Sequence, residues 1–328
     1  MTAATATAGA AGMPSQRRAM TPIATASKPI VAARARRDAG QWRTALAFLA
    51  VPMTLFTMLY IVPLLYSVYI SFFNFGVFGS AGFVGLGNYG WLLKDPYLAK
   101  AVRNTLEYTA VVVPGTMASG LGLALLANSK VRGQRFFRSA FYFPSITSSA
   151  ALTMIFMLVM APGSAGIVDH VLGMFGLPQP NWLGNSSTAL PSIMVLNIWT
   201  GAGSMMLFYL AALQAIPTDV YEAATVEGAT KWQAFRSITF PMLRRSHVFC
   251  GVMGTIGALK VFDQAFIVSG GTGGPNYSTL TLSLYIYRLA FANLSFGYAA
   301  AVGVALFIVI GVLLVSQRKL LQDQGGAA

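Results

Sequence analysis

Six long runs of apolar residues, separated by shorter polar stretches, organise this chain. A helix needs about 20 apolar residues to cross roughly 30 Å of hydrocarbon, and each run is of that order. Because a segment in lipid must satisfy its own backbone hydrogen bonds, we expect all six runs to be helices. The predicted spans cover about residues 44–72, 105–127, 140–161, 190–213, 247–268 and 297–315.

Composition supports a membrane protein. The 328 residues are 55% hydrophobic and 9% charged, whereas a soluble globular domain carries about 25% charged residues. The formal net charge of +13 could suggest nucleic-acid binding, but the charges form short clusters between the apolar runs, not a stripe on a folded domain. The single cysteine, Cys250, excludes a disulfide framework and a cysteine-rich metal site.

The distribution of Lys and Arg predicts the orientation in the membrane, because cytoplasmic loops are enriched in both. They gather in the N-terminal stretch, in the loops after the second and fourth spans, and at the C-terminus: Arg17, Arg18, Lys28, Arg34, Arg36, Arg37, Arg43; Lys130, Arg132, Arg135, Arg138; Lys231, Arg236, Arg244, Arg245; Arg318, Lys319. The opposite side has only Lys94, Lys100, Arg103 and Arg288. We therefore expect a multi-pass plasma- or inner-membrane protein with both termini in the cytoplasm. Its parts would be a disordered basic tail over 1–43, a transmembrane domain over 44–318 and a C-terminal tail over 319–328.

The loop over residues 218–241 is polar and has the signals of two short helices. Asp219 and Thr230 can each cap a helix start, because Glu222 and Gln233 follow three residues later, which is the capping-box spacing. Two capped helices in succession are therefore predicted in a loop that should face the cytoplasm.

Gly228 can end the first of these helices in a left-handed conformation, and Pro241 can end the second. Four residues of the second helix share one face: Trp232, Phe235, Ile238 and Thr239. An aromatic ridge of this kind has two interpretations. It lies on the membrane as an interfacial amphipathic helix, or it docks into a groove on a cytoplasmic partner.

The string "YEAATVEGATKWQAFRSITFP" at 221–241 resembles the EAA loop of permease subunits in binding-protein-dependent ATP-binding-cassette (ABC) importers. Other segments resemble the carbohydrate-uptake branch, which includes maltose and glycerol-3-phosphate permeases: "FVGLGNYGWLLKDPYLAKAVRNTLEYT", "GQRFFRSAFYFPSIT", "IWTGAGSMMLFYLAALQAIP", "KVFDQAFIVSGGTGGP" and "YIYRLAFANLSFGYAAAV". The resemblance covers about residues 45–318. It implies an all-α integral membrane protein with a six-transmembrane-helix bundle, the type I importer permease fold, and cytoplasmic coupling helices.

The resemblance also implies partners and roles. Glu222, Ala223, Ala224 and Gly228 would lie in coupling helices that dock into a cleft of an ATPase subunit, together with the ridge residues Trp232 and Phe235. The expected partners are a second permease subunit, most readily a different chain, two ATPase subunits, an extracytoplasmic solute-binding protein and membrane lipid, without nucleic acid. Read locally, Glu222 is simply a capping residue, and it could serve both roles.

No catalytic or metal-binding pattern is present in the sequence. The chain lacks G-x-x-x-x-G-K-[ST], so it has no phosphate-binding loop of its own. We therefore expect a transport subunit that is not an enzyme and binds no cofactor, with ATP and Mg²⁺ on the partner ATPases. A self-sufficient secondary transporter or channel for a small polar solute is the alternative. Such proteins often have inverted repeats and broken helices, and the sequence shows neither.

Candidate substrate-path residues lie in the fourth and fifth predicted spans. Sugar sites combine aromatic faces with amide and hydroxyl groups, and the resemblance places parts of these spans around the substrate cavity. The candidates are Asn197, Trp199, Gly201, Lys260, Asp263 and Gln264. Lys260 and Asp263, three residues apart on one predicted helix, either pair with each other or line the path. The path should carry a sugar, with a di- or oligosaccharide favoured. Asp169 and His170, outside the spans, are expected to be solvated surface.

Overall fold

The computed structural model describes residue 42, residues 44–129 and residues 133–322, with side chains to residue 316. The predicted N-terminal tail, except Trp42, and the basic residues Lys130 and Arg132 lie outside the described residues. The chain forms two compact units, Met1–Val62 and Pro63–Ala328. The pocket and the helix pair analysed below belong to the second unit.

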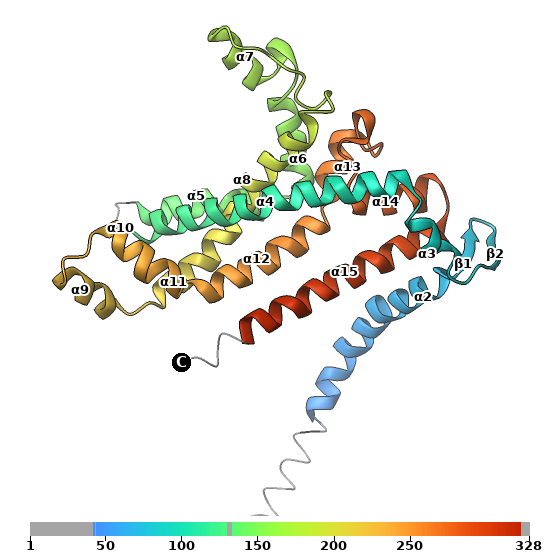
Figure 1. The fold of residues 1–328 in the computed structure, drawn as a ribbon, viewed down its shortest axis with the longest axis horizontal. Coiled ribbons are helices and arrows are strands. Elements are labelled where there is room, and N and C mark those ends of the chain that lie inside the picture. Colours follow the sequence, from blue (N-terminus) through green and yellow to red (C-terminus); the bar gives the residue numbers. More distant parts are fainter. Residues whose placement is uncertain (1–41, 43, 130–132, 323–328) are drawn as a thin grey trace, which may run out of the picture. The chain divides into compact units, whose positions relative to one another are not determined.

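The described residues are mostly helical, as predicted, and contain five helices long and apolar enough to cross a membrane (Figure 1). These helices are Thr44–Ile70, Pro96–Asn128 (α4), Ala189–Gln214 (α8), Arg244–Ser269 (α12 and α13) and Phe296–Ser316 within α15. A sixth candidate is a bent pair, Gln134–Ile146 (α5) and Ser149–Val159 (α6). The count of six holds if the bent pair is one span. The last helix, α15 (Phe296–Gln322), continues beyond residue 318.

The remaining elements connect the spans or are segments within the first and fifth spans. They are η1 (Thr57–Ile61), α2 (Val62–Ile70), β1 (Phe73–Gly76), β2 (Gly79–Phe83), α3 (Gly87–Leu92), η2 (Gly163–Ala165), α7 (Ile167–Met174), α9 (Thr218–Val226), α10 (Lys231–Ala234), η3 (Phe235–Thr239), α11 (Phe240–Met242), α12 (Arg244–Leu259), α13 (Asp263–Ser269), η4 (Pro275–Tyr277), α14 (Leu282–Tyr287) and η5 (Arg288–Ala292). The antiparallel hairpin β1–β2 is an addition to the predicted all-helical fold. Its glycines Gly79 and Gly82 have positive φ, which favours a tight reversal over a helix.

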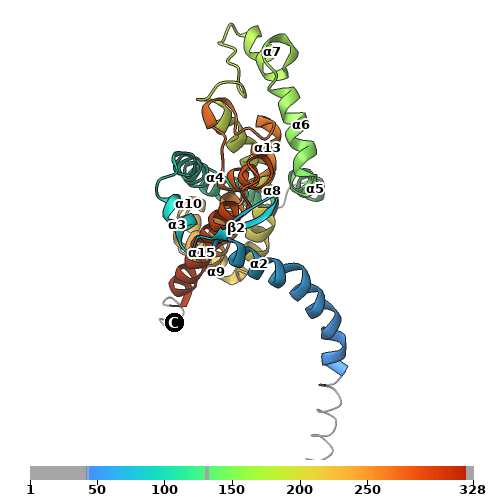
Figure 2. The same ribbon diagram turned by 90° about the vertical axis from the view of Figure 1, so that its right-hand side faces the viewer.

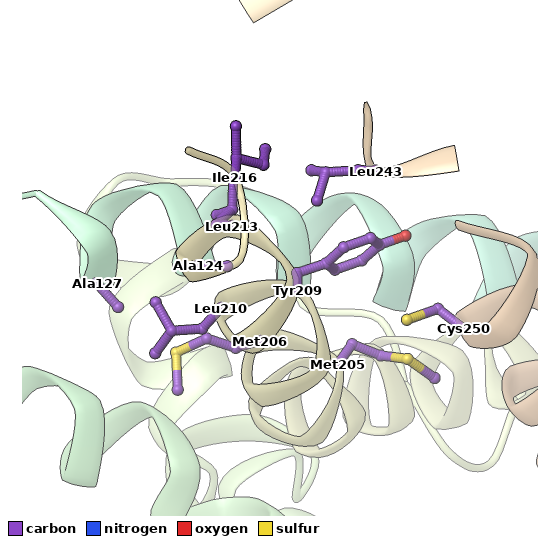
Figure 3. Packing of buried hydrophobic residues seen from close by; sticks show 10 residues of the cluster. All are labelled: Ala124, Ala127, Met205, Met206, Tyr209, Leu210, Leu213, Ile216, Leu243 and Cys250. Atoms are coloured by element: carbon purple, nitrogen blue, oxygen red, sulfur yellow. The ribbon is translucent and has the colours of Figure 1, made fainter. Parts of the chain in front are cut away.

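Helices α4 and α8 lie against each other along much of their length, because glycines remove the side chains that would hold them apart. A Cβ atom added at Gly120 would lie 2.4 Å from Cβ of Met205, and one at Gly201 would lie 2.9 Å from Cγ2 of Thr116. At one end of this pair, a buried cluster joins α4 and α8 to Leu243 and to Cys250 on α12 (Figure 3).

The third predicted span is not straight. Helices α5 and α6 meet at 97°, and Thr147 at the break has an extended backbone. Pro144, inside α5, lacks the N–H that a continuing helix would use. Near this end of α5, the hydroxyls of Ser145 and Thr147 donate to the carbonyls of Tyr142 and Phe143, and a helix end leaves its last carbonyls without intrahelical partners.

The fifth predicted span is present as Arg244–Ser269 but is interrupted within its length. Helix α12 ends at Leu259, and α13 begins at Asp263. The Thr281 hydroxyl donates to the carbonyl of Val261 at the break, over 2.9 Å. This contact from a distant segment stabilises the interruption, and local sequence does not reveal it. Broken helices, which the sequence did not show, are therefore present in two of the candidate spans.

Candidate functional site

A polar pocket lies at the bend between α5 and α6. Its volume is about 230 Å³, and α8 and the first turn of α13 complete its wall. Most lining residues carry a hydroxyl or an amide: Ser145, Thr147, Ser149, Thr153, Asn197, Thr200, Ser204 and Gln264; the others are Pro144, Leu152, Leu196 and Gly201. Within the described residues, no charged side chain lines this pocket.

The hydrogen bonds within the pocket leave its groups able to accept hydrogen bonds from a ligand. Nε2 of Gln264 donates to Oγ of Ser149 over 2.7 Å and so connects α13 to α6. The hydroxyls of Ser145 and Thr153 donate to backbone carbonyls of their own helices. A hydroxyl that donates to the backbone keeps oxygen lone pairs that can accept. The pocket can therefore bind a ligand with several hydroxyl groups.

The structure brings three of the six predicted path residues together. Asn197, Gly201 and Gln264 line the pocket, although Asn197 also donates to the carbonyl of Ile193. Trp199 instead borders an apolar groove between α4, α5 and α8, and it is 54% exposed.

Of the two alternatives for Lys260 and Asp263, the structure does not form the ion pair. Both side chains are exposed, and no ion pair joins them in the described part of the chain. The helix break between the two residues is the reason, because the three-residue spacing brings side chains together only on a continuous helix.

Sequence reasoning missed the hydroxyl groups at the bend. Ser145, Thr147, Ser149 and Thr153 supply half of the polar lining named above. The available signal was the string "PSITSS" at 144–149. Such a density of hydroxyl residues inside an apolar run is expensive in lipid unless the hydroxyls face the backbone or a polar cavity.

The polar loop forms two short helical segments, as predicted, joined at Gly228. This glycine has φ of +80°, in the left-handed region. Thr230 and Gln233 make the predicted capping box at the start of α10, with the Gln233 N–H donating to Oγ1 of Thr230. The Tyr221 and Thr239 hydroxyls, 2.9 Å apart, connect α9 to η3.

Two details of the predicted loop were wrong. Asp219 does not cap α9, which begins at Thr218 after Pro217 and has no side-chain cap. Pro217, with its φ fixed by the ring, occupies the cap position itself. Pro241 does not end the second helix; it lies in the first turn of α11, which continues to Met242. The missing N–H of proline is tolerated in a first turn.

The loop presents an exposed surface with a hollow of about 420 Å³ between its two helical segments. Ala224 and Gly228 line the hollow, whereas Glu222 and Ala223 are exposed elsewhere on α9. The Trp232 ring is 66% exposed and stacks on half-buried Phe235, with ring centroids 5.6 Å apart. Of the predicted ridge, Trp232 is therefore available to a partner in the isolated chain, whereas Thr239 is buried.

Two buried carboxylates stabilise other parts of the fold by accepting hydrogen bonds from other segments of the chain. Asp95 caps α4 and accepts hydrogen bonds from the hydroxyls of Tyr285 and Tyr298. Burial by itself raises the pKa of the Asp95 carboxyl, but the two tyrosine hydroxyls and two backbone N–H groups hold it below its usual value. Asp169, expected on solvated surface, is instead fully buried and accepts from Nε1 of Trp182. Burial of this carboxylate depends on partners from outside its own helix.

Comparisons with known proteins agree with the resemblance. The family described as "Binding-protein-dependent transport system inner membrane component" matches residues 117–323. The multiple sugar-binding transport system permease protein MsmF of Streptococcus mutans is 35% identical over 274 residues, which cover 83% of this chain and 93% of MsmF. The lactose transport system permease protein LacF of Rhizobium radiobacter is 36% identical over 271 residues, covering 81% of this chain and 90% of LacF.

A solved structure supports the same fold. One chain of a bacterial ABC transporter involved in the import of the acidic polysaccharide alginate superposes with a TM-score of 0.78. The match covers 88% of this chain and 99% of the other, at 23% sequence identity. The spans, the bent pair and the loop helices thus form an ABC importer permease fold. The chain belongs to the family of inner-membrane components of binding-protein-dependent transport systems.

Proposed function

We propose that this chain is the translocating subunit of an ATP-driven importer for an uncharged di- or oligosaccharide. An extracytoplasmic solute-binding protein delivers the sugar, and two separate ATPase subunits supply the energy. A second permease subunit, similar to this chain, completes the path. Both termini and the loop that contains α9 and α10 face the cytoplasm, in agreement with the positions of Lys and Arg.

The observation that carries this proposal is the uncharged polar pocket at the α5–α6 bend. Sugar hydroxyls both donate and accept hydrogen bonds, which matches a lining of hydroxyl and amide groups. A phosphorylated or acidic sugar calls for cationic side chains, above all Arg, and none lines this pocket within the described residues. Relatives named for lactose and arabinooligosaccharide transport support a saccharide substrate.

The exposed loop accounts for coupling to the ATPases. Its hollow, lined by Ala224 and Gly228, and the exposed face of Trp232 offer a shaped surface to a separate protein. Glu222, on the exposed surface of α9, pairs with a basic group of that protein. Closure of the ATPase dimer moves these helices and changes which side of the membrane the pocket faces.

Reconstitution tests the proposal. The chain is placed in proteoliposomes with its permease partner, the ATPases and the binding protein, and uptake of neutral and uronate-containing oligosaccharides is measured. We expect uptake that requires ATP and prefers neutral sugars. Preference for uronates would contradict the substrate class, and uptake driven by an ion gradient without ATPase would contradict the importer.

A pair of serine variants locates the path. Ser149→Ala removes a pocket hydroxyl that accepts from Gln264, and its loss should raise the KM for sugar about twofold to tenfold. Ser119→Ala is the matched control, because its hydroxyl donates to the Gly115 carbonyl and borders the apolar groove instead. An equal effect of both substitutions would contradict the placement of the path.

The broken helices favour a second candidate, a secondary transporter, because such helices are common near the sites of those proteins. The breaks at residues 147–148 and 260–262 meet this description. The same reconstitution distinguishes the two candidates, since a secondary transporter needs neither ATP nor a binding protein.

A further inference from the structure

Five aromatic side chains form a continuous series from the exposed loop into the helical bundle. We define this aromatic series as Trp232, Phe235, Phe240, His247 and Tyr209. Successive ring centroids lie 5.6, 6.1, 4.5 and 5.3 Å apart, within the range of favourable aromatic pairs. Trp232 is 66% exposed, Phe240 49% and Tyr209 1%. The series therefore begins at the loop surface and ends in the core.

The series crosses a point at which the backbone helix is interrupted. Helix α11 ends at Met242, and α12 begins at Arg244, with Leu243 as a non-helical residue between them. The Phe240 and His247 rings lie on either side of this interruption, 4.5 Å apart. Side-chain contact thus joins the loop to α12 across this interruption.

A hydrogen bond then joins α12 to α8. Nδ1 of His247 and the Tyr209 hydroxyl are 2.9 Å apart. Figure 3 shows the Tyr209 side chain pointing from α8 toward the segment that carries Leu243 and Cys250. The Cys250 thiol, also on α12, is a second side-chain hydrogen-bond partner of the Tyr209 hydroxyl. The His247–Tyr209 hydrogen bond is directional. It joins α12, which Phe240 of the loop contacts through His247, to the pocket-bearing helix α8.

The pocket lies a short distance farther along α8. Ser204, a pocket-lining residue, is five positions before Tyr209, which corresponds to about 7.5 Å along a helix axis. Helix α8 is closely packed against α4 at Gly120 and Gly201. A displacement of Tyr209 therefore moves a stiff, packed helix and not an isolated side chain.

We propose that the His247–Tyr209 hydrogen bond is the joint through which movement of the loop reaches the substrate pocket. His247 and Tyr209 are positioning residues: neither lines the pocket or the exposed hollow. This inference rests on the proposed function, because it assigns a route to the coupling that the importer requires. It adds two residues that the resemblance to importer permeases did not single out.

The test compares sugar uptake with ATP hydrolysis in the reconstituted complex. Tyr209→Phe keeps the ring and removes the hydroxyl. We expect the complex to assemble in normal stoichiometry and with Tm lowered by no more than the loss of one buried hydrogen bond explains. The ratio of sugar imported to ATP hydrolysed should fall about threefold to tenfold. A hydroxyl with a purely structural role would lower Tm and leave this ratio unchanged.

Tyr108→Phe is the matched control. Tyr108 is buried to the same extent on α4, and its hydroxyl makes no hydrogen bond within the described residues. Its ratio should equal that of the wild type. A wild-type ratio of sugar imported to ATP hydrolysed in Tyr209→Phe would contradict the proposed role of the His247–Tyr209 bond. An equal fall of this ratio in Tyr108→Phe would contradict it as well.

Two substitutions at His247 complete a double-mutant cycle. His247→Asn keeps a polar atom close to the position of Nδ1 and should retain at least three times the ratio of His247→Leu. Tyr209→Phe should have a clearly smaller effect in the His247→Leu background than in the wild type, because the His247–Tyr209 bond is already lost there. Additive losses would overturn the proposal. Failure of the wild-type complex to import sugar with ATP would overturn the proposed function itself, whereas wild-type uptake with unaltered variant ratios would refute the joint alone.

Discussion

Substitution of Gly228 isolates the backbone requirement of the turn between α9 and α10. Its φ is +80°, and a Cβ atom added there would have no heavy atom within 4 Å. Space is therefore available for a side chain, and the cost of substitution comes from the left-handed conformation alone. For an ordinary residue that cost is about 1–2 kcal/mol, and Asn tolerates the conformation better than other residues.

Two side chains of similar size separate conformation from bulk. Gly228→Val should lower the affinity for the ATPase subunits about fivefold to thirtyfold, as the conversion of 1–2 kcal/mol requires. Gly228→Asn should lower it far less. The assay is titration of ATPase subunits onto reconstituted permease, with bound ATPase measured after sedimentation of the vesicles.

Gly90→Val is the control for this series. Gly90 lies in α3, has open space around its Cβ position and has no positive φ, so its substitution should leave ATPase binding unchanged. Equal losses for Val and Asn at position 228 would refute the conformational argument, because they would show that bulk at the hollow determines binding.

Three further predictions follow from single contacts. Thr230→Ala should speed amide hydrogen exchange at the start of α10, since it removes a capping box worth about 1 kcal/mol. Asp219→Ala is the control, because Asp219 caps no helix, and it should leave amide exchange at the start of α9 unchanged. Gly120→Ala places a methyl group 2.4 Å from Cβ of Met205 and should destabilise the protein in detergent by about 1–3 kcal/mol, measured by thermal unfolding; an unchanged Tm would contradict the close packing. The lowered pKa of Asp95 means that its stabilisation is complete above the unfolded-state pKa of about 3.9 and is lost as pH falls through the lower folded-state value. Asp95→Asn should therefore flatten the acid side of a profile of Tm against pH, and an unchanged acid side would contradict this assignment.

The sequence predicted the features that depend on local composition or local spacing. Apolar length located the spans, and the Thr230 capping box and the Gly228 turn formed as expected. The predictions that failed concern features that depend on contacts between residues far apart in the sequence. The interruption after Leu259 is stabilised by Thr281, so the helical spacing of Lys260 and Asp263 was misleading.

The candidate site was predicted in part for the same reason. Asn197 and Gly201 lie on one continuous helix, where spacing is informative, and both line the pocket. The hydroxyls of Ser149 and Thr153 reach the pocket only because the chain turns through 97° just before them. A proline and a row of hydroxyl residues can signal such a bend, but its angle is set by packing of α6 against α13.

The glycine contacts between α4 and α8 limit how this protein can change shape. At these glycines, atoms of the facing helix lie within 3 Å of the position that a Cβ atom would occupy. The two helices therefore cannot slide past each other by part of a turn without steric overlap, and they must move together as one rigid body. Alternation between two states then has to be absorbed at hinges elsewhere. Thr147, at the first interruption, lines the polar pocket, and the interruption at residues 260–262 comes just before Gln264, which also lines it. Bending at these two places would reshape the pocket while α4 and α8 keep their fixed contact.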